Sequence, residues 1–599
     1  MPSTDACPAK TAVPKMPKLE ILLADPDIRH VSGPKVTWLL SGCDEKDVAR
    51  LEKSGSDGND IEAEICTRAS DATVIKVVHC NGEAHKVSAW RGPTSIHEVF
   101  QLKRSNGDLI FTDHFRNVLA NLPTCERTPS DDAIIDHFLF RATPGHNTYC
   151  QRIARLGHGE RISIELNSGQ SNQKLFHRFT ETPSPGNVSE YLCHVDHAFE
   201  EVLSPFKDRK DVATLFSGGI DSTLLHTYLG SKATALNLVV DVKDATSTME
   251  AEYAKSAADS LGISLHRQEV RQSEFLNDLA LATEKTAMPV HNGMLPVFAQ
   301  AFSNDCEKFI CGWNAGDLFG ESALFNRVAS WLANPLLLWC LEVGAPAIVT
   351  KDPARRNVWS ARLEVLLPAA REMSVDPEST LGLGARWETY TDFDVAEMIF
   401  GQEAVLRRLE KRLDYVRERV ALTAPCDNSF LRHLEIGYWV GSLCRDFTQQ
   451  LRHLAMASEK SVLLPYYAGS VVRCAHSIPV GERYIRRLEG KYLLKRLLKH
   501  RLQDYPVRQR KGPTALAPFP RYYTSGPLSR IWDDYEMPDF IEGEAKKRML
   551  SLPLNVTYSA ISYAIWKRRV LECQHFEPLP SAQSYTWPYL CTDPFEATV

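Results

Sequence analysis

The chain has 599 residues, of which 44% are hydrophobic and 24% are charged, and its formal net charge is −6. Such a length allows two or more domains with full cores, and the composition is that of an ordinary soluble enzyme. The small net charge gives no reason to expect nucleic acid or an anionic membrane as a partner. No apolar run reaches about 18 residues, so we expect no membrane span. The fifteen cysteines include no CxxC pair, which disfavours a zinc site or a disulfide framework and favours a cytoplasmic location.

The first part of the chain is predicted to be rich in β-structure. Residues 1–20 mix proline, lysine and small residues without an apolar block, so we expect a loose tail there and no secretory signal. Short β-rich runs follow between 21 and 181: VTWLL at 36–40, ATVIKVVH at 72–79, VFQLKR at 99–104, DLIFT at 108–112 and RISIEL at 161–166. Turn signals such as Asn106-Gly107 separate them, as a mainly antiparallel, hairpin-rich domain requires. The Pro/Ser/Gly stretch that follows predicts a linker at 182–195.

The second part, from 196 to 599, changes to an alternating pattern. Apolar strands are predicted at 213–216, 235–240 and 308–313, and helices at 222–228 and 251–261. Strands that alternate with helices indicate an α/β domain with a parallel sheet covered on both faces. After about residue 325 the chain is predicted to be largely helical, as in the amphipathic segment 397–421 and the basic segment 490–502.

The string LFSGGIDST at 215–223 lies between a predicted strand and a predicted helix. Ser217, Gly218 and Gly219 allow a tight turn whose N–H groups face an anion, and the helix adds its positive N-terminal end. We expect Asp221 to hold a magnesium ion on the phosphates of ATP, and Ser222 to donate its hydroxyl to them. The string is not a Walker loop; it matches the SGGxDS loop of enzymes that split ATP between the α and β phosphates. A plain helix-capping turn is the alternative, which the full string in this context disfavours.

This string and its surroundings resemble the asparagine synthetase family over most of the chain. The similar segments, in the family's order, are 91–120, 131–164, 311–321, 451–467, 490–498 and 508–513. The resemblance implies a degenerate N-terminal domain of the Ntn-hydrolase-like kind, also called glutamine amidotransferase type 2-like. It also implies a C-terminal domain of the adenine-nucleotide α-hydrolase-like kind with helical additions.

The resemblance implies that a substrate carboxylate attacks the α-phosphorus of ATP and that a nitrogen nucleophile then displaces AMP. Alignment of the two reactants supplies much of the first step, and magnesium and cationic side chains stabilise the charge on the phosphates. By this resemblance Asp221 and Asp317 are magnesium ligands, and Lys511, or Arg510 beside it, stabilises a transition state. The alternatives are that Asp317 caps a helix and that Lys511 is a solvated charge in a basic run.

The sequence departs from the family pattern at its beginning. Glutamine-using members start with a cysteine whose free α-amine activates its own thiol. Here residue 2 is Pro and the first cysteine is Cys7, so we expect no glutaminase chemistry; exposure of Cys7 by cleavage after Ala6 is the alternative. The NGE at 81–83 lies too close to Arg91 to be the family's glutamine-binding motif, and we expect a turn there.

The acceptor end of the site departs as well. Trp313 stands where the second signature carries an acidic residue, and Asp317 is displaced by one position. Ser461 and Ala468 replace the Glu and Asp of the family's segment around Pro465. The RKGP stretch lacks the usual Gly-Phe pair. The ATP end is therefore retained while the aspartate and ammonia end is altered, as in a change of substrate.

Three residues are candidates for the altered acceptor site. They are Glu459, as a catalytic group, and Tyr466 and Tyr467, although tyrosines beside a proline more often belong to a core. Without ammonia of its own, the enzyme would use an amine carried by the substrate or by a second substrate. β-Lactam synthetases and the macrolactam cyclases of lasso peptides are relatives of this type.

The length, the degenerate first domain and the CG-then-Asp signature resemble the lasso cyclases most. That resemblance implies a small-molecule or peptide substrate and a leader-cleaving protease as a partner. Two other functions stay open. An ordinary asparagine synthetase is disfavoured by the loss of the acidic residue at 461, and a non-catalytic scaffold is disfavoured by the intact SGGIDS loop.

Overall fold

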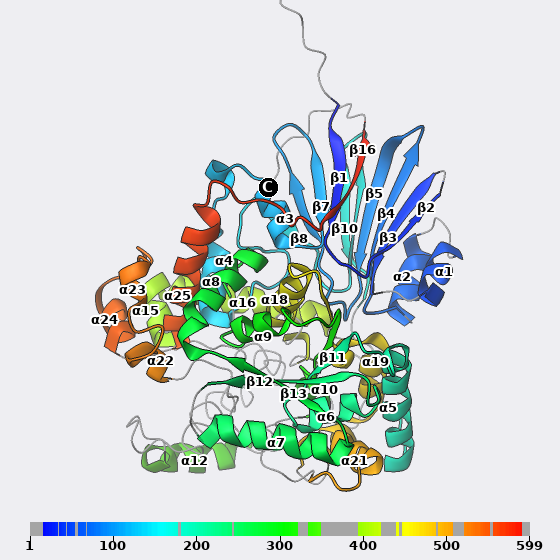
Figure 1. Ribbon diagram of the computed structural model, residues 1–599. Coiled ribbons are helices and arrows are strands. Elements are labelled where there is room, and N and C mark those ends of the chain that lie inside the picture. Colours follow the sequence, from blue (N-terminus) through cyan, green and yellow to red (C-terminus); the bar gives the residue numbers. More distant parts are fainter. Residues whose placement is uncertain are drawn as a thin grey trace, which may run out of the picture.

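The structure is a computed structural model. It describes residues 16–33, 35–42, 45–53, 58–67, 69–177, 181–241, 245–290, 292–320, 334–348, 393–420, 436, 439–441, 446–484, 486, 489–506, 520–551 and 555–589. Within these ranges the first part of the chain forms two packed β-sheets, and the second part forms an open parallel sheet with helices around it (Figure 1). The predicted change from a β-rich part to an α/β part is therefore confirmed.

The first part is a sandwich of a five-stranded and a six-stranded sheet. In spatial order the five-stranded sheet contains β16 (Gln583–Pro588), β1 (Lys18–Leu23), β7 (Leu109–Thr112), β6 (Phe100–Lys103) and β8 (Ile153–Arg155). The six-stranded sheet contains β10 (Ser171–Leu175), β9 (Glu160–Glu165), β5 (Glu83–Arg91), β4 (Thr73–Cys80), β3 (Val36–Ser41) and β2 (Arg29–Ser32). Alternate residues of each strand point between the sheets, so Leu19 and Ile21 share a core with Ile75, Val77 and Val87.

Helices pack on the outer faces of both sheets. On the five-stranded sheet, α3 (Phe115–Ala120) and α4 (Asp131–Phe140) pack Val118 and Phe138 against Leu102. On the six-stranded sheet, α1 (Glu45–Lys53) and α2 (Gly58–Thr67) pack Leu51 and Ile61 against Trp38, Val74 and Trp90. The layers thus run helix, sheet, sheet, helix. The identification of this part as an Ntn-hydrolase-like domain stays a prediction.

The second part is built on a five-stranded parallel sheet, as predicted. Its spatial order is β13 (Leu265–Val270), β12 (Thr234–Val240), β11 (Val212–Leu215), β14 (Lys308–Ile310) and β15 (Ser461–Leu463), and every neighbouring pair is parallel. The chain adds β12 and β13 on one side of β11 and then β14 and β15 on the other. The order therefore reverses between β11 and β14, and ligands of such sheets bind at the carboxyl ends of the strands beside this reversal.

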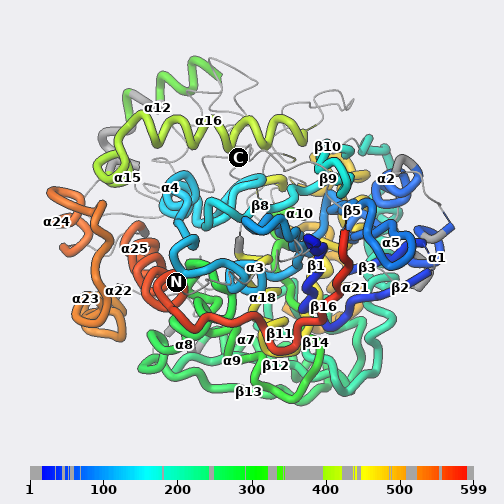
Figure 2. The backbone as a smooth tube through the Cα atoms, turned by 90° about the horizontal axis from the view of Figure 1, so that it is seen from above, coloured from blue at the N-terminus to red at the C-terminus, as the bar shows by residue number. Residues whose placement is uncertain are grey.

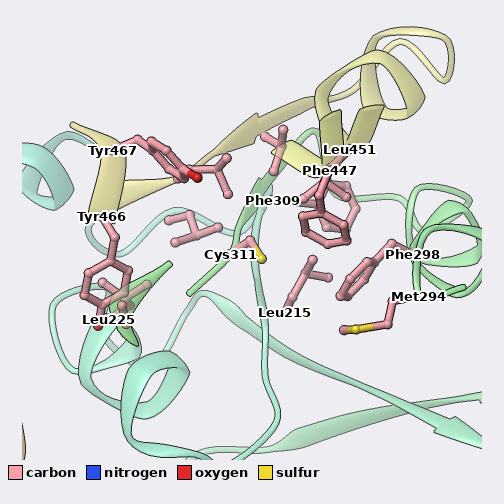
Figure 3. Packing of buried hydrophobic residues seen from close by; sticks show 14 of the residues in the cluster. Leu215, Leu225, Met294, Phe298, Phe309, Cys311, Phe447, Leu451, Tyr466 and Tyr467 are labelled. Carbon is pink, nitrogen blue, oxygen red and sulfur yellow. The ribbon is translucent and has the colours of Figure 1, made fainter. Parts of the chain in front are cut away.

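Helices surround the parallel sheet. They include α5 (Val188–Leu203), α6 (Ile220–His226), α7 (Ala245–Leu261), α8 (Phe275–Thr286), α9 (Leu295–Ala301), α18 (Asp446–Met456), α19 (Gly469–Ser477) and α21 (Tyr492–Arg501). Their apolar side chains meet those of the strands, and Figure 3 shows Phe298, Phe447 and Leu451 packed around Leu215 and Phe309. No described helix is long and apolar enough to cross a membrane.

Further described helices lie in the second half of the chain. They are α10 (Ala315–Phe319), α12 (Pro335–Ile348), α15 (Phe393–Phe400), α16 (Gln402–Arg419), α20 (Val480–Arg483), α22 (Pro520–Thr524), α23 (Ile531–Asp534), α24 (Gly543–Ser551) and α25 (Asn555–Trp566). The segment predicted to be helical at 397–421 is helical from 397 to 419 in two pieces, the end of α15 and α16, which Gly401 separates with a φ of 84°. The turn predicted at 81–83 is confirmed, since Asn81 and Gly82 both have positive φ in the β4–β5 hairpin.

The structure differs from the predicted linker at 182–195. Helix α5 begins at Val188, and Asn187 and Glu190 close a reciprocal capping box at its start. Tyr191 and Phe199 are buried on one face of the helix, so it packs as part of the α/β half. The Pro/Ser/Gly composition of the stretch obscured this capping signal.

The ends of the chain also differ from the prediction. Strand β1 starts at Lys18, inside the predicted tail at 1–20. Strand β16 pairs antiparallel with β1 over six residues, from Lys18↔Pro588 to Leu23↔Gln583, although it lies in the range 196–599 predicted for the second domain. Figures 1 and 2 both show β16, in red, beside β1, in blue. Pairing between segments so distant in sequence leaves no local signal.

Candidate functional site

The loop between β11 and α6 carries the predicted phosphate-binding residues. Gly218 has a φ of 69°, and a Cβ at this position would lie 2.4 Å from backbone atoms of Tyr253 and Ala254 in α7. The hydroxyl oxygens of Ser217 and Ser222 are 3.2 Å apart, and the N–H of Gly219 donates to Ser217 Oγ at 3.3 Å. The loop is therefore tightly folded against α7, and only glycine fits at position 218.

The two signature strings of the sequence meet at this loop. Residues 311–314 follow the carboxyl end of β14, which neighbours β11 at the reversal of strand order. A Cβ on Gly312 would lie 3.2 Å from Asp221 Cβ and 3.2 Å from the backbone N of Ser222. The close approach of Gly312 thus brings the second signature onto the start of α6.

A lysine that the sequence analysis gave no role completes the site. Lys491 Nζ lies 2.6 Å from Asp221 Oδ2, and its side chain is 10% exposed. Lys491 has a φ of 56°, and its N–H donates to the carbonyl of Gly320 at 2.7 Å. The residue stands directly before α21, in the basic segment used for the resemblance. Its partner Asp221 is 270 positions away in the chain, so no local pattern could have indicated the contact.

The residues present fit a nucleotide phosphate chain and its divalent cation. Asp221 Oδ1 is buried and has no hydrogen-bond partner within the described residues. Such an oxygen is suited to a hard cation like Mg²⁺, which prefers carboxylate oxygens. The ammonium of Lys491 would lie beside the same phosphates and offset their charge.

Two buried tyrosines hold the backbone of the loop. The hydroxyl of Tyr505 donates to the carbonyl of Gly218 at 2.6 Å, and that of Tyr466 donates to the carbonyl of Asp221 at 3.4 Å. Burial raises the pKa of Tyr505 to about 12 and holds the pKa of Tyr466 well above its ordinary value. Both hydroxyls therefore stay protonated as donors over the pH range in which enzymes work.

A family comparison agrees with this geometry. The family model described as asparagine synthase matches residues 195–535, more than half of the chain. The chain belongs to the asparagine synthase family. It is therefore an ATP-dependent amide ligase by class, with an adenine-nucleotide hydrolase-like fold in the matched range, and the family usually uses Mg²⁺. A search of curated proteins found no match.

In this family member, Asp317 lies in the 311–321 segment that carries part of the resemblance. It is in the first turn of α10, which follows the 311–314 loop, and is 7% exposed. Its carbonyl accepts a hydrogen bond from the hydroxyl of Tyr484. The N-cap residue of α10 is Asn314, so Asp317 is not itself the N-cap, but it lies in the first turn, where a carboxylate favours the helix N-terminus. Its role as a magnesium ligand stays a prediction.

Glu459 lies away from the nucleotide end. It is exposed, has a φ of 56° and occupies the turn between α18 and β15. This turn precedes β15, whereas the phosphate loop follows β11, and the strands of the sheet are parallel. Glu459 therefore lies at the amino-terminal ends of the strands, whereas the site lies at their carboxyl ends. This placement removes the geometric basis for a catalytic role. Lys511 and Arg510 lie outside the described residues.

The altered acceptor end is apolar and well packed. The Trp313 ring stacks on Phe447 with centroids 3.9 Å apart. Tyr466 and Tyr467 are 0% and 2% exposed, and Figure 3 shows both within the packed core. The hydroxyl of Tyr467 contacts the side-chain amide of Asn314. These tyrosines hold the loops in place, so the core alternative for them is the correct one.

Proposed function

We propose that this chain is an AMP-forming amide ligase that closes a lactam in a peptide or another natural product, as the lasso-peptide cyclases do. The observation that supports the proposal is the contrast between the two ends of the site. The nucleotide end has the glycine loop, Asp221 and Lys491, whereas the acceptor end has the Trp313–Phe447 stack. An apolar wall suits a peptide or lactam precursor better than free aspartate and ammonia.

The proposed reaction has two steps. A substrate carboxylate oxygen attacks the α-phosphorus of ATP, and the bond to the bridging oxygen breaks to release pyrophosphate. The amine then attacks the activated carbonyl, AMP leaves, and the amine loses a proton. The glycine loop would hold the phosphates, and Lys491 would offset their charge as pyrophosphate departs. When bound, Mg²⁺ held by Asp221 would withdraw charge from the phosphate oxygens.

We also propose that the first part of the chain is a glutaminase-like domain that has lost its reaction. In glutamine-using relatives the nucleophile begins the first strand, whereas here Lys18 begins β1. The backbone N–H of Lys18 donates to Asp108 Oδ1 at 2.8 Å, and β16 pairs along the same strand. An internal, hydrogen-bonded peptide N–H leaves no free amine to activate a thiol. The amine for the ligase would then come with the substrate, and a leader-cleaving protease would expose it.

The alternative function is asparagine synthesis, with which the family match agrees equally well. The purified chain would be incubated with ATP, Mg²⁺ and one of three acceptor sets: aspartate with ammonium, aspartate with glutamine, or precursor peptides bearing a free N-terminus and an Asp or Glu. We expect AMP and loss of one water from a peptide, and no asparagine. Asparagine from ammonium would replace our proposal with a synthetase, and asparagine from glutamine would refute the lost glutaminase. Asp221→Asn, with an unchanged circular dichroism spectrum, is expected to abolish AMP formation.

A further inference from the structure

The outer face of the six-stranded sheet is only partly covered by helices. Helices α1 and α2 pack over the end of the face that holds Trp38, Val74 and Trp90, and Figure 1 shows them beside β3. The rest of the face is hollowed by a cavity of about 490 Å³. This volume lies in the range of known ligand pockets. We call this hollow the sheet groove; it is lined by Lys35, Lys76, Lys86, Trp90, Arg161 and Glu165 with the residues between them.

The sheet groove is basic. Its lining has four cationic side chains and one carboxylate. Glu165 pairs with Lys86 at 2.5 Å, and Arg161 pairs with Glu62, outside the lining, at 2.9 Å. Lys76 is only 5% exposed, and its Nζ lies 4.7 Å from the centre of the Trp38 ring. Burying a lysine this deeply costs free energy, which is hard to explain if the face served only for packing. Burial together with the charge of Lys86 lowers the pKa of Lys76.

The sheet groove also holds a hydrogen-bond donor that lacks an acceptor. Trp90 is 2% exposed, and its indole N–H has no partner within the described residues. Beside it the hydroxyls of Ser88 and Ser163 lie 2.7 Å apart. Buried polar groups are nearly always paired. A ligand with acceptor oxygens would therefore satisfy Trp90 and add negative charge beside the lysines at the same time.

The register of the strands sets the spacing of these groups. Arg161 pairs with Trp90, Ser163 with Ser88, and Glu165 with Lys86, while Lys76 lies opposite Ser88 on the other side. Successive outward rows are two residues apart, or about 6.6 Å, and the three rows span about 13 Å. A single carboxylate or phosphate cannot reach all three rows. The same-side groups of an extended peptide have this spacing.

We propose that the sheet groove docks an extended acidic peptide segment with carboxylates at alternate positions. The carboxylates face Lys35, Lys76 and Lys86, and an acceptor oxygen of the segment takes the Trp90 N–H. The groove lies on the sandwich and is separate from the ATP site, so a docking role for this domain does not depend on glutaminase chemistry. Its occupant is a peptide because one indole and three rows of side chains offer no series of stacking platforms for bases.

The test is a binding measurement on the full chain without ATP. Fluorescence anisotropy would follow three labelled ten-residue probes: alternating Glu-Ser, alternating Lys-Ser, and an oligothymidylate. We expect the Glu-Ser peptide alone to bind, more weakly at high salt because surface charges are screened. Equal binding of both peptides, or tighter binding of the oligonucleotide, would overturn the proposal. Because no turnover is needed, a failed ligase assay does not affect this result.

Variants locate the binding in the groove. Lys35→Gln with Lys76→Gln is expected to weaken Glu-Ser binding at least about tenfold, since two charged contacts are lost. Trp90→Phe keeps the ring and removes the N–H, and is expected to weaken binding severalfold. The control is Lys18→Gln with Lys411→Gln, the same charge change at exposed positions outside the groove. If the buried Lys76 variant unfolds, the exposed Lys35→Gln alone carries the test. Unchanged affinity in Lys35→Gln and Trp90→Phe would refute the site.

Discussion

Gly218 shows how one residue fixes the shape of the phosphate loop. Its left-handed φ of 69° disfavours any side chain, and a Cβ would also collide with the backbone of Tyr253 at 2.4 Å. We expect Gly218→Ala to abolish AMP formation because the loop must open to relieve the contact. Gly262 is a matched control, since its φ of 66° is similar but nothing lies within 4 Å of its Cβ position. Gly262→Ala is expected to cost about 1 kcal/mol of stability and to stay active. Equal loss of activity in both variants would show that strain alone is responsible.

The buried His226, at the C-terminal end of α6, makes the stability of the fold sensitive to acid. It is 1% exposed, its Nδ1 lies 3.0 Å from Thr214 Oγ1, and burial lowers its pKa to about 4. In the unfolded chain the pKa of a histidine is about 6.5. The unfolded state therefore binds the proton more readily, and stability is lost as the pH falls from about 6.5 toward about 4.

His226→Gln isolates this effect. Between about pH 7.5 and about pH 5 the native chain is expected to lose about 2 kcal/mol more unfolding free energy than the variant does, because Gln does not titrate. Urea unfolding of both proteins at the two pH values measures the difference, and the remaining histidines cancel in the comparison. Identical pH dependence in the two proteins would mean that His226 takes up its proton without unfolding.

At the scale of single elements, the sequence predicted the strands whose own residues show an alternating or continuous apolar pattern. The runs at 36–40, 72–79 and 235–240 alternate or are continuously apolar, and they form β3, β4 and β12. Strand β16 was missed because its six residues, QSYTWP, are mostly exposed or half-buried and gain their structure from pairing with β1. The start of α5 was missed because the composition around Asn187 indicates a loop. Tertiary pairing overrides weak local propensity in such cases.

The pairing of β16 with β1 predicts that the last strand stabilises the first domain. A chain that ends at Ala582 loses the ladder along β1 and the burial of Tyr589, which is 1% exposed. We expect a loss of roughly 3–5 kcal/mol, since each ladder bond contributes ~1 kcal/mol, and aggregation through the newly exposed edge. A chain that ends at Tyr589 keeps β16 and is the control. Thermal unfolding and light scattering measure both. Equal stability of the two chains would show that β16 is dispensable.

At the scale of the whole molecule, the candidate site joins segments far apart in the chain. The sequence identified Asp221 because SGGIDS is a local string, and it selected the 311–321 segment for the same reason. Lys491 and Tyr505 could not be assigned, since their contacts with Asp221 and Gly218 arise only when α21 packs beside α6. The prediction of a catalytic Glu459 failed because sequence proximity to Pro465 does not reveal at which end of the strands a residue lies.

The two halves of the molecule meet at a buried ion cluster. Arg452, on α18 of the ligase half, places Nη2 2.9 Å from Asp25 Oδ2 and 3.7 Å from Asp113 Oδ2 of the sandwich, and all three side chains are at most 4% exposed. Asp113 also accepts the backbone N–H groups of Ala24 and Asp25. One guanidinium thus offsets two buried carboxylates across the contact between the halves.

Arg452→Met is expected to destabilise the protein by about 3–5 kcal/mol, because it leaves two buried charges without their cation. Since the carboxylates belong to the sandwich, the loss should appear first as separation of the halves, with faster proteolysis between them. The triple variant Arg452→Met, Asp25→Asn and Asp113→Asn removes the charges together and is expected to recover most of the stability. Thermal unfolding and limited proteolysis distinguish these outcomes. If the triple variant is no more stable than Arg452→Met, packing by the arginine stem and not charge holds the halves together.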